Sequence, residues 1–241
     1  ISRMVDAGRV RLTLELGGSD PMIVCGDADL DRAVAGAVAG RFYNCGQICT
    51  AVKRLFVADS VADGFIGRLK AATESLRVGD GAAEGTDIGP LNSIGGLQRI
   101  EEMVEDSIGS AKVLTGGLRP DGPGNFYAPT LITGLEPDSR LLTEEVFGPV
   151  LPIVRFGDLD EAVDMANSTR FGLGASIWTN DMRNASKAID SVRSGILWVN
   201  RHSRIPPEVP FGGVAGSGIG RENGPNSLDG YMVEKTVIVS P

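Results

Sequence analysis

Three cysteines and one histidine come first, because both residue types can serve as nucleophiles, bases or metal ligands. Cys45 and Cys49 are four residues apart, and the single histidine, His202, lies far along the chain. A zinc site needs a second cysteine pair or nearby histidines, so no metal site is expected. Cys25 ends an apolar run, which favours a buried and unreactive side chain. His202 lies in a proline-bounded loop, where a solvated or core histidine is expected.

Cys49 is the candidate nucleophile. The chain reaches it from a predicted helix through the dipeptide Gly46-Gln47. Backbone amides and nearby dipoles at such a turn can lower the pKa of a thiol, so that a thiolate forms without a histidine. Composition alone does not separate this interpretation from an ordinary cysteine.

Two carboxylates are candidates for acid–base chemistry. Glu15 lies where an expected strand, Val10 to Leu16, gives way to Gly17-Gly18. Ligands bind in the crevice at the carboxyl ends of parallel strands, so a carboxylate there would face them. Glu145 belongs to a glutamate pair next to an aromatic residue and a Gly-Pro turn. The alternatives are a solvent-facing strand residue and an exposed loop glutamate.

Short apolar runs alternate with helical spacing along the chain, which predicts an α/β fold with a mostly parallel sheet flanked by helices. Strands are predicted at Val10–Leu16, Pro21–Val24, Lys53–Ala58, Ala111–Leu114, Val150–Phe156, Gly174–Trp178, Gly195–Val199 and Val233–Val239. Helices are predicted at Leu30–Arg41, capped by Asp27 or Asp29, after Ser60, within Pro90–Ile108, at Leu159–Ala166, capped by Asp158, and near Met182–Val192.

Composition excludes several classes of protein. Of 241 residues, 42% are apolar and 22% charged, which is typical of a soluble globular protein and not of a disordered chain. The net charge of −8 argues against a nucleic-acid partner. No apolar run is long enough for a membrane span, and no secretion signal opens the chain, so a cytoplasmic protein is expected. The chain begins with Ile1 in what looks like the middle of a helix, which suggests a fragment.

Four motifs in register identify a family resemblance. They are Leu14-Glu15-Leu16-Gly17-Gly18, the segment 44–51 around Cys49, Glu145-Val146-Phe147-Gly148-Pro149, and Pro210-Phe211-Gly212-Gly213 with the segment 217–222. Their order, with 34 residues from Glu15 to Cys49 and 96 from Cys49 to Glu145, resembles the NAD(P)-dependent aldehyde dehydrogenase superfamily. The resemblance covers nearly the whole chain but only the carboxyl-terminal half of such an enzyme.

The resemblance implies a role for each motif. Cys49 would attack the aldehyde carbon to give a thiohemiacetal, which becomes a thioester when hydride leaves. Glu15 would be the general base that activates water for hydrolysis. The backbone N–H of Cys49 would donate to the oxyanion, worth about 3 kcal/mol in other such sites. The implied contacts to NAD or NADP are Glu145, Phe147, Leu16 and Gly17. The implied or expected substrate contacts are Ile48, Thr50, Ile205, Phe211 and Arg204.

The resemblance also implies a domain division. Residues 1–18 would be the end of a cofactor-binding domain, 19–215 the catalytic domain, and 216–241 a segment whose strand joins a homo-oligomer, a dimer or tetramer. The family's second oxyanion donor, an asparagine, and its pyrophosphate-binding turn have no counterpart in this sequence. The piece alone is therefore expected not to act as a dehydrogenase.

Several alternatives stay open at this stage. A non-catalytic assembly module and a residual ester or thioester hydrolase are the alternatives to a dehydrogenase, whereas a coenzyme-A-acylating relative is disfavoured by the presence of Glu15. Arg204 would suit a semialdehyde's carboxylate, or be a solvated or subunit-contact residue. Cys45 is interpreted as a bystander thiol, with a redox bridge to Cys49 as the alternative. The sequence does not select the aldehyde, or NAD over NADP.

Overall fold

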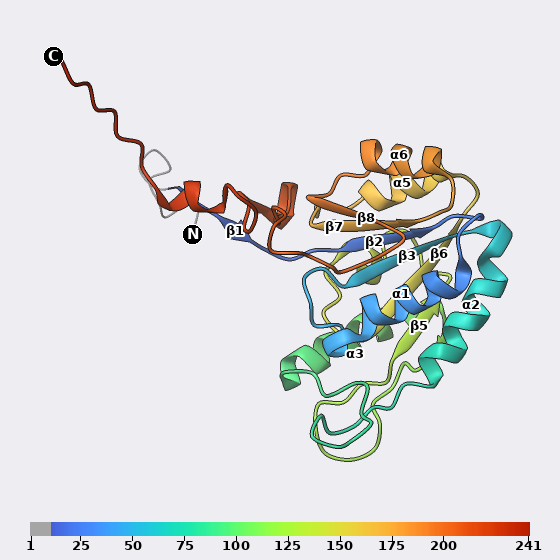
Figure 1. Ribbon diagram of the computed structural model, residues 1–241. Helices are drawn as coiled ribbons and strands as arrows, with labels where there is room; N and C mark the ends of the chain where they lie inside the picture. The colour runs from blue at the N-terminus through green and yellow to red at the C-terminus, as the bar shows by residue number, and fades with distance from the viewer. Residues whose placement is uncertain (1–10) are drawn as a thin grey trace.

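A seven-stranded sheet lies at the centre of the protein in the computed structural model, which describes residues 11–241 (Figure 1). The strand order is β4-β5-β6-β3-β2-β7-β8, and β4 alone runs antiparallel to its neighbour. The predicted α/β fold with a mostly parallel sheet is therefore confirmed. The strands are β2 (Asp20–Val24), β3 (Val52–Ala58), β4 (Lys112–Thr115), β5 (Thr130–Thr133), β6 (Val150–Phe156), β7 (Gly174–Trp178) and β8 (Ile196–Val199).

Helices cover both faces of this sheet (Figure 1). Alternate residues of β3 enter two separate apolar cores: Leu55 and Val57 pack with α1, α2 and α3, whereas Phe56 packs with α5 and α6. Every residue of β3 is buried as a result, which explains its nearly continuous apolar sequence. The helices are α1 (Leu30–Phe42), α2 (Asp59–Glu74), α3 (Ile94–Ile108), α4 (Arg140–Thr143), α5 (Leu159–Asn167) and α6 (Met182–Ser191).

The helix starts follow the expected capping chemistry with one exception. Asp29 caps α1 by accepting from the N–H of Arg32, and Asp158 caps α5 by accepting from that of Glu161. The expected cap at Ser60 is wrong, because α2 already begins at Asp59 and no side chain caps it. Strand β5 and the short helix α4 were not predicted, although β4 and β8, which are equally short, were.

A second, two-stranded sheet corrects the first predicted strand. Within the described residues the strand expected from Val10 to Leu16 is only β1 (Leu14–Glu15), and Val10 itself lies outside them. β1 pairs antiparallel with β9 (Gly218–Ile219), next to the 3-10 turns η2 (Ala215–Ser217) and η3 (Ser227–Tyr231). Backbone hydrogen bonds to this late segment, rather than to the main sheet, keep β1 short.

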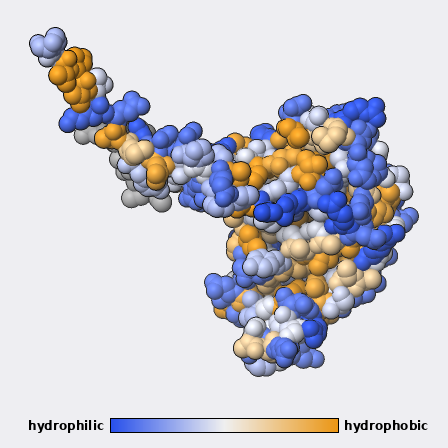
Figure 2. All heavy atoms as spheres, viewed as in Figure 1, coloured by the Kyte–Doolittle hydropathy of each residue, from blue (hydrophilic) through white to orange (hydrophobic). Residues whose placement is uncertain are grey.

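The chain end projects away from the main sheet as an arm (Figure 1). The expected strand Val233–Val239 is not formed within this chain: it is exposed, and no backbone group of the described residues pairs with it. A strand needs a partner to satisfy its N–H and C=O groups, and none of the residues that the structure describes supplies one. Figure 2 shows the apolar residues gathered near the tip of the arm, where Val237, Ile238 and Val239 are 70–87% exposed.

Two helix glycines allow a matched test of packing between α1 and the sheet. A Cβ on Gly36, in α1, would collide with the buried indole of Trp178, whereas a Cβ on Gly64, in α2, would meet nothing. We expect Gly64→Ala to stabilise the protein by up to about 1 kcal/mol through helix propensity. Gly36→Ala should destabilise it despite the same propensity gain. Urea unfolding measures both, and equal stabilisation by the two substitutions would contradict this packing.

Candidate active site

The candidate residues gather at the amino-terminal edge of the central sheet. Cys49 lies just before β3, Asp20 opens β2, and Glu145 lies in the loop before β6. Because these three strands are parallel neighbours, their amino ends meet at one edge. The expectation that Glu15 would face a ligand from the carboxyl end of a parallel strand is wrong. It instead reaches the region from β1, outside the parallel sheet.

A left-handed turn leads from α1 to Cys49. It includes the 3-10 segment η1 (Tyr43–Gly46), in which Asn44, Cys45 and Gly46 have φ of +50°, +57° and +72°. Asn44 and Gln47 lock the turn, since each side-chain amide donates to the other's backbone carbonyl, at 3.1 and 3.2 Å. Two consecutive non-glycine residues in this conformation are costly, and such conformations cluster at functional sites.

Arg41 ties this turn to the Glu145 loop. Its guanidinium is fully buried and donates to the carbonyls of Gly46, Val146 and Gly148, and to Val52 at the start of β3. Burial lowers the pKa of Arg41 to about 9, so the group stays cationic at neutral pH. A Cβ on Gly46 would strike both this guanidinium and Gly148, which explains the glycine.

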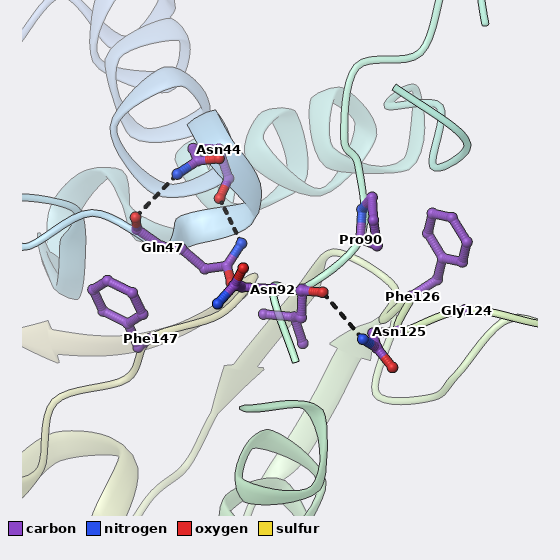
Figure 3. A pocket seen from close by; sticks show the side chains of 9 residues that line it. Asn44, Gln47, Pro90, Asn92, Gly124, Asn125, Phe126 and Phe147 are labelled. Atoms are coloured by element: carbon purple, nitrogen blue, oxygen red, sulfur yellow. Dashed lines mark hydrogen bonds between the residues drawn. The ribbon is translucent and has the colours of Figure 1, made fainter. Parts of the chain in front are cut away.

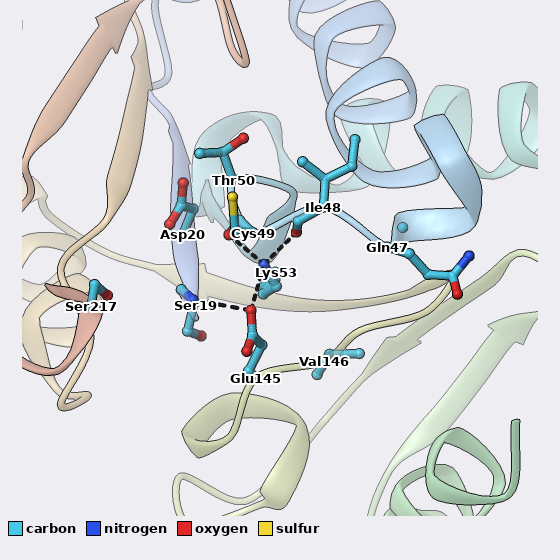
Figure 4. Close-up of polar contacts among 12 residues, drawn as sticks. Ser19, Asp20, Gln47, Ile48, Cys49, Thr50, Lys53, Glu145, Val146 and Ser217 are labelled. Carbon is cyan, nitrogen blue, oxygen red and sulfur yellow. Dashed lines mark hydrogen bonds and ion pairs between the residues drawn. The ribbon is translucent and has the colours of Figure 1, made fainter. Parts of the chain in front are cut away.

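Lys53 makes a second tie directly beneath Cys49 (Figure 4). Its ammonium group is fully buried and donates to the carbonyls of Ile48 and Cys49, at 2.8 and 2.6 Å. It also lies 3.5 Å from Oε1 of Glu145. The same carboxylate oxygen accepts from the N–H of Gly18 at 3.0 Å. The ion pair between Lys53 and Glu145 thus joins three segments: the turn that carries Cys49, the Gly17-Gly18 segment and the Glu145 loop.

The thiol of Cys49 is half-buried, and opposing charges act on it. Desolvation raises its pKa above the ordinary value, and the negative charges of Asp20 and Glu15 raise it further. Lys53 and a hydrogen bond from the N–H of Thr50 lower it. No group in the described part of the chain accepts from the N–H of Cys49, which leaves that donor free for an oxyanion.

Glu15 has the features of a general base. It is half-buried, and its Oε1 has no hydrogen-bond partner among the described residues. Desolvation, followed by the charge of Glu222, raises the pKa of Glu15, while Arg221 lowers it. A carboxylate with a raised pKa accepts a proton from water more readily near neutral pH. Because Glu15 also acts electrostatically on Cys49, the two groups belong to one environment.

The residues expected to contact the nicotinamide cofactor lie beside this pair and fit that role. Leu16 and Phe147 are large apolar side chains left 49% and 44% exposed next to the Gly17-Gly18 segment and Lys53. A Cβ on Gly17 would collide with the Glu145 carboxylate, so only glycine allows that carboxylate so near the backbone. Together they offer two apolar surfaces and one acidic group, a suitable set for an aromatic ring on a ribose.

The expected substrate residues are only partly brought together. Ile48 and Thr50 flank Cys49, and buried Phe211 precedes Gly212, whose backbone packs against the Glu15 carboxylate. Ile205 is half-buried in the loop after β8. Exposed Arg204 lies apart, where it lines a largely apolar pocket of about 520 Å³ with neighbours that include Trp198 and Arg201.

The remaining thiols and the histidine are structural. Cys25 and Cys45 are buried, and desolvation raises the pKa of each to about 11. His202 lies between Ser176 and the carbonyl of Thr50, each 2.8 Å from a ring nitrogen. Since that carbonyl can only accept, Nε2 carries the proton, and desolvation lowers the pKa of His202 to about 4. It holds the backbone next to Cys49 as a neutral, half-buried ring.

A larger hollow of about 730 Å³ opens beyond the turn (Figure 3). Amide side chains and two phenylalanines line it, including Asn44, Gln47, Asn92 and Phe147. It shares Phe147 with the site but does not include Cys49. Over residues 11–241 there is no group of three or more His, Cys, Asp or Glu side chains arranged for a metal ion, and no helix is long and apolar enough to span a membrane.

Sequence reasoning missed four charged residues that shape this edge of the sheet. Arg41, Lys53, Arg54 and Asp20 are all buried, and none was proposed as functional. Two adjacent cations in the otherwise apolar strand β3 were the available signal, because charged side chains are almost never buried unless they are paired.

Comparisons with known proteins all point to one family, which matches nearly the whole chain. The model of the aldehyde dehydrogenase family matches residues 1–237. Succinate-semialdehyde dehydrogenase (NADP+) 1 of Mycobacterium tuberculosis is 45% identical over 228 residues, which are 94% of this chain and 50% of the relative. The enzyme named succinate-semialdehyde dehydrogenase (NADP+) in Mycobacterium leprae is 42% identical over 228 residues, 94% of this chain and 50% of the relative. The chain therefore spans about half the length of the curated relatives it matches.

Solved structures agree. An NAD-dependent aldehyde dehydrogenase from Sinorhizobium meliloti superposes with a TM-score of 0.92 at 39% identity, over 95% of this chain and 46% of that one. Lactaldehyde dehydrogenase from Escherichia coli gives a TM-score of 0.88 at 37% identity, over 91% of this chain and 46% of that one.

Thiol accessibility predicts selective labelling. Iodoacetamide should modify Cys49 well before Cys25 or Cys45 in the native protein, because only Cys49 is partly exposed. Since the pKa of Cys49 is raised, its labelling rate should still be rising as the pH passes 9. Peptide mass spectrometry locates the label, and Cys45→Ala should leave the rate unchanged. A rate that levels off below pH 7 would show that the raised pKa is wrong.

Proposed function

This chain belongs to the aldehyde dehydrogenase family, and we propose that it supplies the catalytic half of an NAD(P)-dependent aldehyde dehydrogenase. The observation that carries the proposal is the convergence of the Cys49 turn, the Gly17-Gly18 segment that follows Glu15, and the Glu145 loop around the buried ammonium group of Lys53. The division at residues 18 and 215 into cofactor-domain remnant, catalytic domain and terminal segment is part of the same proposal.

The first half-reaction uses Cys49. Its thiolate forms an Sγ–C bond to the aldehyde carbon, and the carbonyl oxygen becomes an oxyanion that accepts from the free N–H of Cys49. NAD or NADP, when bound, would supply the two-electron acceptor, so that loss of a hydride from that carbon would leave a thioester on Cys49. Leu16 and Phe147 would hold the nicotinamide ring, and Glu145 the adjoining ribose.

The second half-reaction uses Glu15. Its carboxylate takes a proton from water as the water oxygen attacks the thioester carbon. The Sγ–C bond then breaks, the carboxylic acid leaves, and Cys49 returns as the thiolate. The unpartnered Oε1 and the raised pKa of Glu15 support this role.

We propose a semialdehyde as the substrate class. The support is the name of the relatives, succinate-semialdehyde dehydrogenase, at 42–45% identity. Arg204 remains a candidate for the distal carboxylate, on charge alone. The proposal can be tested by comparing the oxidation of a semialdehyde with that of an aldehyde of equal length that lacks the carboxylate.

An assembly role for the chain end is part of the proposal. Residues 233–239 are rich in β-branched side chains and end in the wholly apolar run Val237-Ile238-Val239. Strand β8 is an edge of the main sheet, so it can accept a further strand. We propose that this segment pairs with the sheet of a second copy.

Ester hydrolysis tests the catalytic pair without requiring a cofactor. Acylation of Cys49 by p-nitrophenyl acetate releases p-nitrophenolate, and deacylation then needs the general base. We expect Cys49→Ala to remove the activity. Glu15→Gln should keep the initial burst of about one p-nitrophenolate per chain but slow the steady state by roughly 100-fold or more.

Stopped-flow absorbance measures both phases of that reaction. Cys45→Ala is the matched control and should behave like the unmodified chain, because its thiol is buried. Undiminished turnover in Cys49→Ala would remove Cys49 from the mechanism. A Glu15→Gln variant with normal steady-state turnover would remove Glu15.

Sizing tests the assembly role. The chain should elute as a dimer or larger, and a double change to proline at Val237 and Ile238 should yield a monomer. Adjacent N–H groups of a strand point in opposite directions, so one of the two prolines must remove a pairing donor. Light scattering gives the mass; an unchanged oligomer in the proline variant would show that another surface holds the copies together.

A further inference from the structure

We propose that Lys53 is a positioning residue for the nucleophile, whose buried ammonium group fixes the Cys49 turn and favours the Cys49 thiolate, with Asp20 as its opposing charge. The inference rests on the proposed function, in which Cys49 is the nucleophile. Neither Lys53 nor Asp20 takes part in the reaction steps described above.

The geometry places the ammonium group where the site's segments converge. Lys53 is fully buried, with hydrogen bonds to the carbonyls of Ile48 and Cys49 and an ion pair with Glu145. The ring of Phe147 lies 5.9 Å from it on the cofactor side. Two of its contacts therefore hold the turn of the nucleophile, and two face the expected nicotinamide site.

Packing alone does not require a lysine here. Burying an ammonium group costs several kcal/mol before its partners compensate, and an apolar side chain of similar length would fill the same space in β3. The neighbouring Arg54 is equally buried but points to the other face, where it donates to Ser19, Met165 and Ala166. The positive charge of Lys53 therefore serves the Cys49 side of the strand, where it binds the carbonyls of Ile48 and Cys49.

Asp20 opposes Lys53 from the start of β2. Its carboxylate is buried, Oδ1 accepts from the N–H of Gly174 at 3.0 Å, and Oδ2 has no partner among the described residues. Burial, partly countered by Lys53, raises the pKa of Asp20 to about 6, and burial lowers that of Lys53 to about 8. Each group favours the charged form of the other, so that the two form a buried pair of opposite charge.

The other charged groups around Lys53 and Cys49 set the background. Arg41 approaches Lys53 from α1 and Glu145 from the loop before β6. Neutral His202 lies behind Thr50, and Glu15 adds its negative charge to Cys49 from β1. Against this background, Lys53 and Asp20 act on the thiol with opposite signs. Substitutions at the two positions should therefore move its reactivity in opposite directions.

The test is the alkylation rate of Cys49 by iodoacetamide at pH 7 in the full 241-residue chain. Lys53→Met removes the charge and keeps the length. Loss of a nearby positive charge should raise the thiol pKa by roughly one pH unit, which lowers the fraction of thiolate at pH 7. The higher nucleophilicity of a more basic thiolate compensates for part of that loss. We therefore expect a rate roughly three- to fivefold slower. Asp20→Asn should accelerate the reaction, and it retains a side chain that can accept from Gly174.

The pH profile separates charge from a purely structural effect. As the pH rises through about 8, the ammonium group of Lys53 loses its proton, so the difference between the unmodified chain and Lys53→Met should shrink. Arg155→Met is the control: it removes a cation of the neighbouring strand β6 that pairs with Asp59 and Asp63, not with the groups around Cys49, and it should leave the alkylation rate unchanged. Circular dichroism checks that each variant is folded.

Each result is decisive for one of the two proposals. Slower alkylation in Lys53→Met with faster alkylation in Asp20→Asn supports the inference. If Lys53→Met does not fold, Lys53→Gln decides, because its amide can still donate to the turn while the charge is gone, and an unchanged rate overturns the inference. Label on Cys49 with unchanged rates in both variants would overturn the inference and leave the proposed function intact. Label on Cys25 or Cys45 in place of Cys49 would overturn the proposed function itself.

Discussion

Two buried cations hold the amino-terminal edge of the sheet in its observed form. Arg41 binds four backbone carbonyls from three segments, and Lys53 binds two more in the nucleophile turn. Apart from that of Val52 at the start of β3, these carbonyls belong to loops and to the end of the 3-10 segment η1, outside the α-helices and the main sheet. Because an unpaired buried carbonyl costs as much as a lost hydrogen bond, the cations make an otherwise unfavourable turn stable.

That constraint explains how a half-buried cysteine can be presented at a fixed position. The chain leaves α1, passes through Asn44 and Cys45 in a left-handed conformation, and enters β3 within a few residues of Cys49. The strain of the turn is balanced by the ties to Arg41 and Lys53 and by the reciprocal amides of Asn44 and Gln47. The same ties fix the Glu145 loop, so one set of contacts organises both the thiol and the expected cofactor side.

The sequence predicted the regular elements well and their irregular connections poorly. Helix α1 begins directly after its cap Asp29, and strand β6 is a short, mostly apolar run, so their ranges could be predicted nearly to the residue. The bonds from Arg41 to the Glu145 loop and the pairing of β1 with β9 join residues more than 100 positions apart, and no local pattern encodes them. The pair Cys49 and Glu15 came from a family resemblance, whereas the edge of the sheet on which they meet came only from the structure.

The central claim is that Cys49 and Glu15 serve the same bound acyl group. A crystal structure of the Glu15→Gln variant, acylated on Cys49, tests it most directly. The account predicts the acyl oxygen beside the N–H of Cys49 and a water molecule between the acyl carbon and the side chain at position 15. An acyl group separated from position 15 by protein, with no path for water between them, would contradict it.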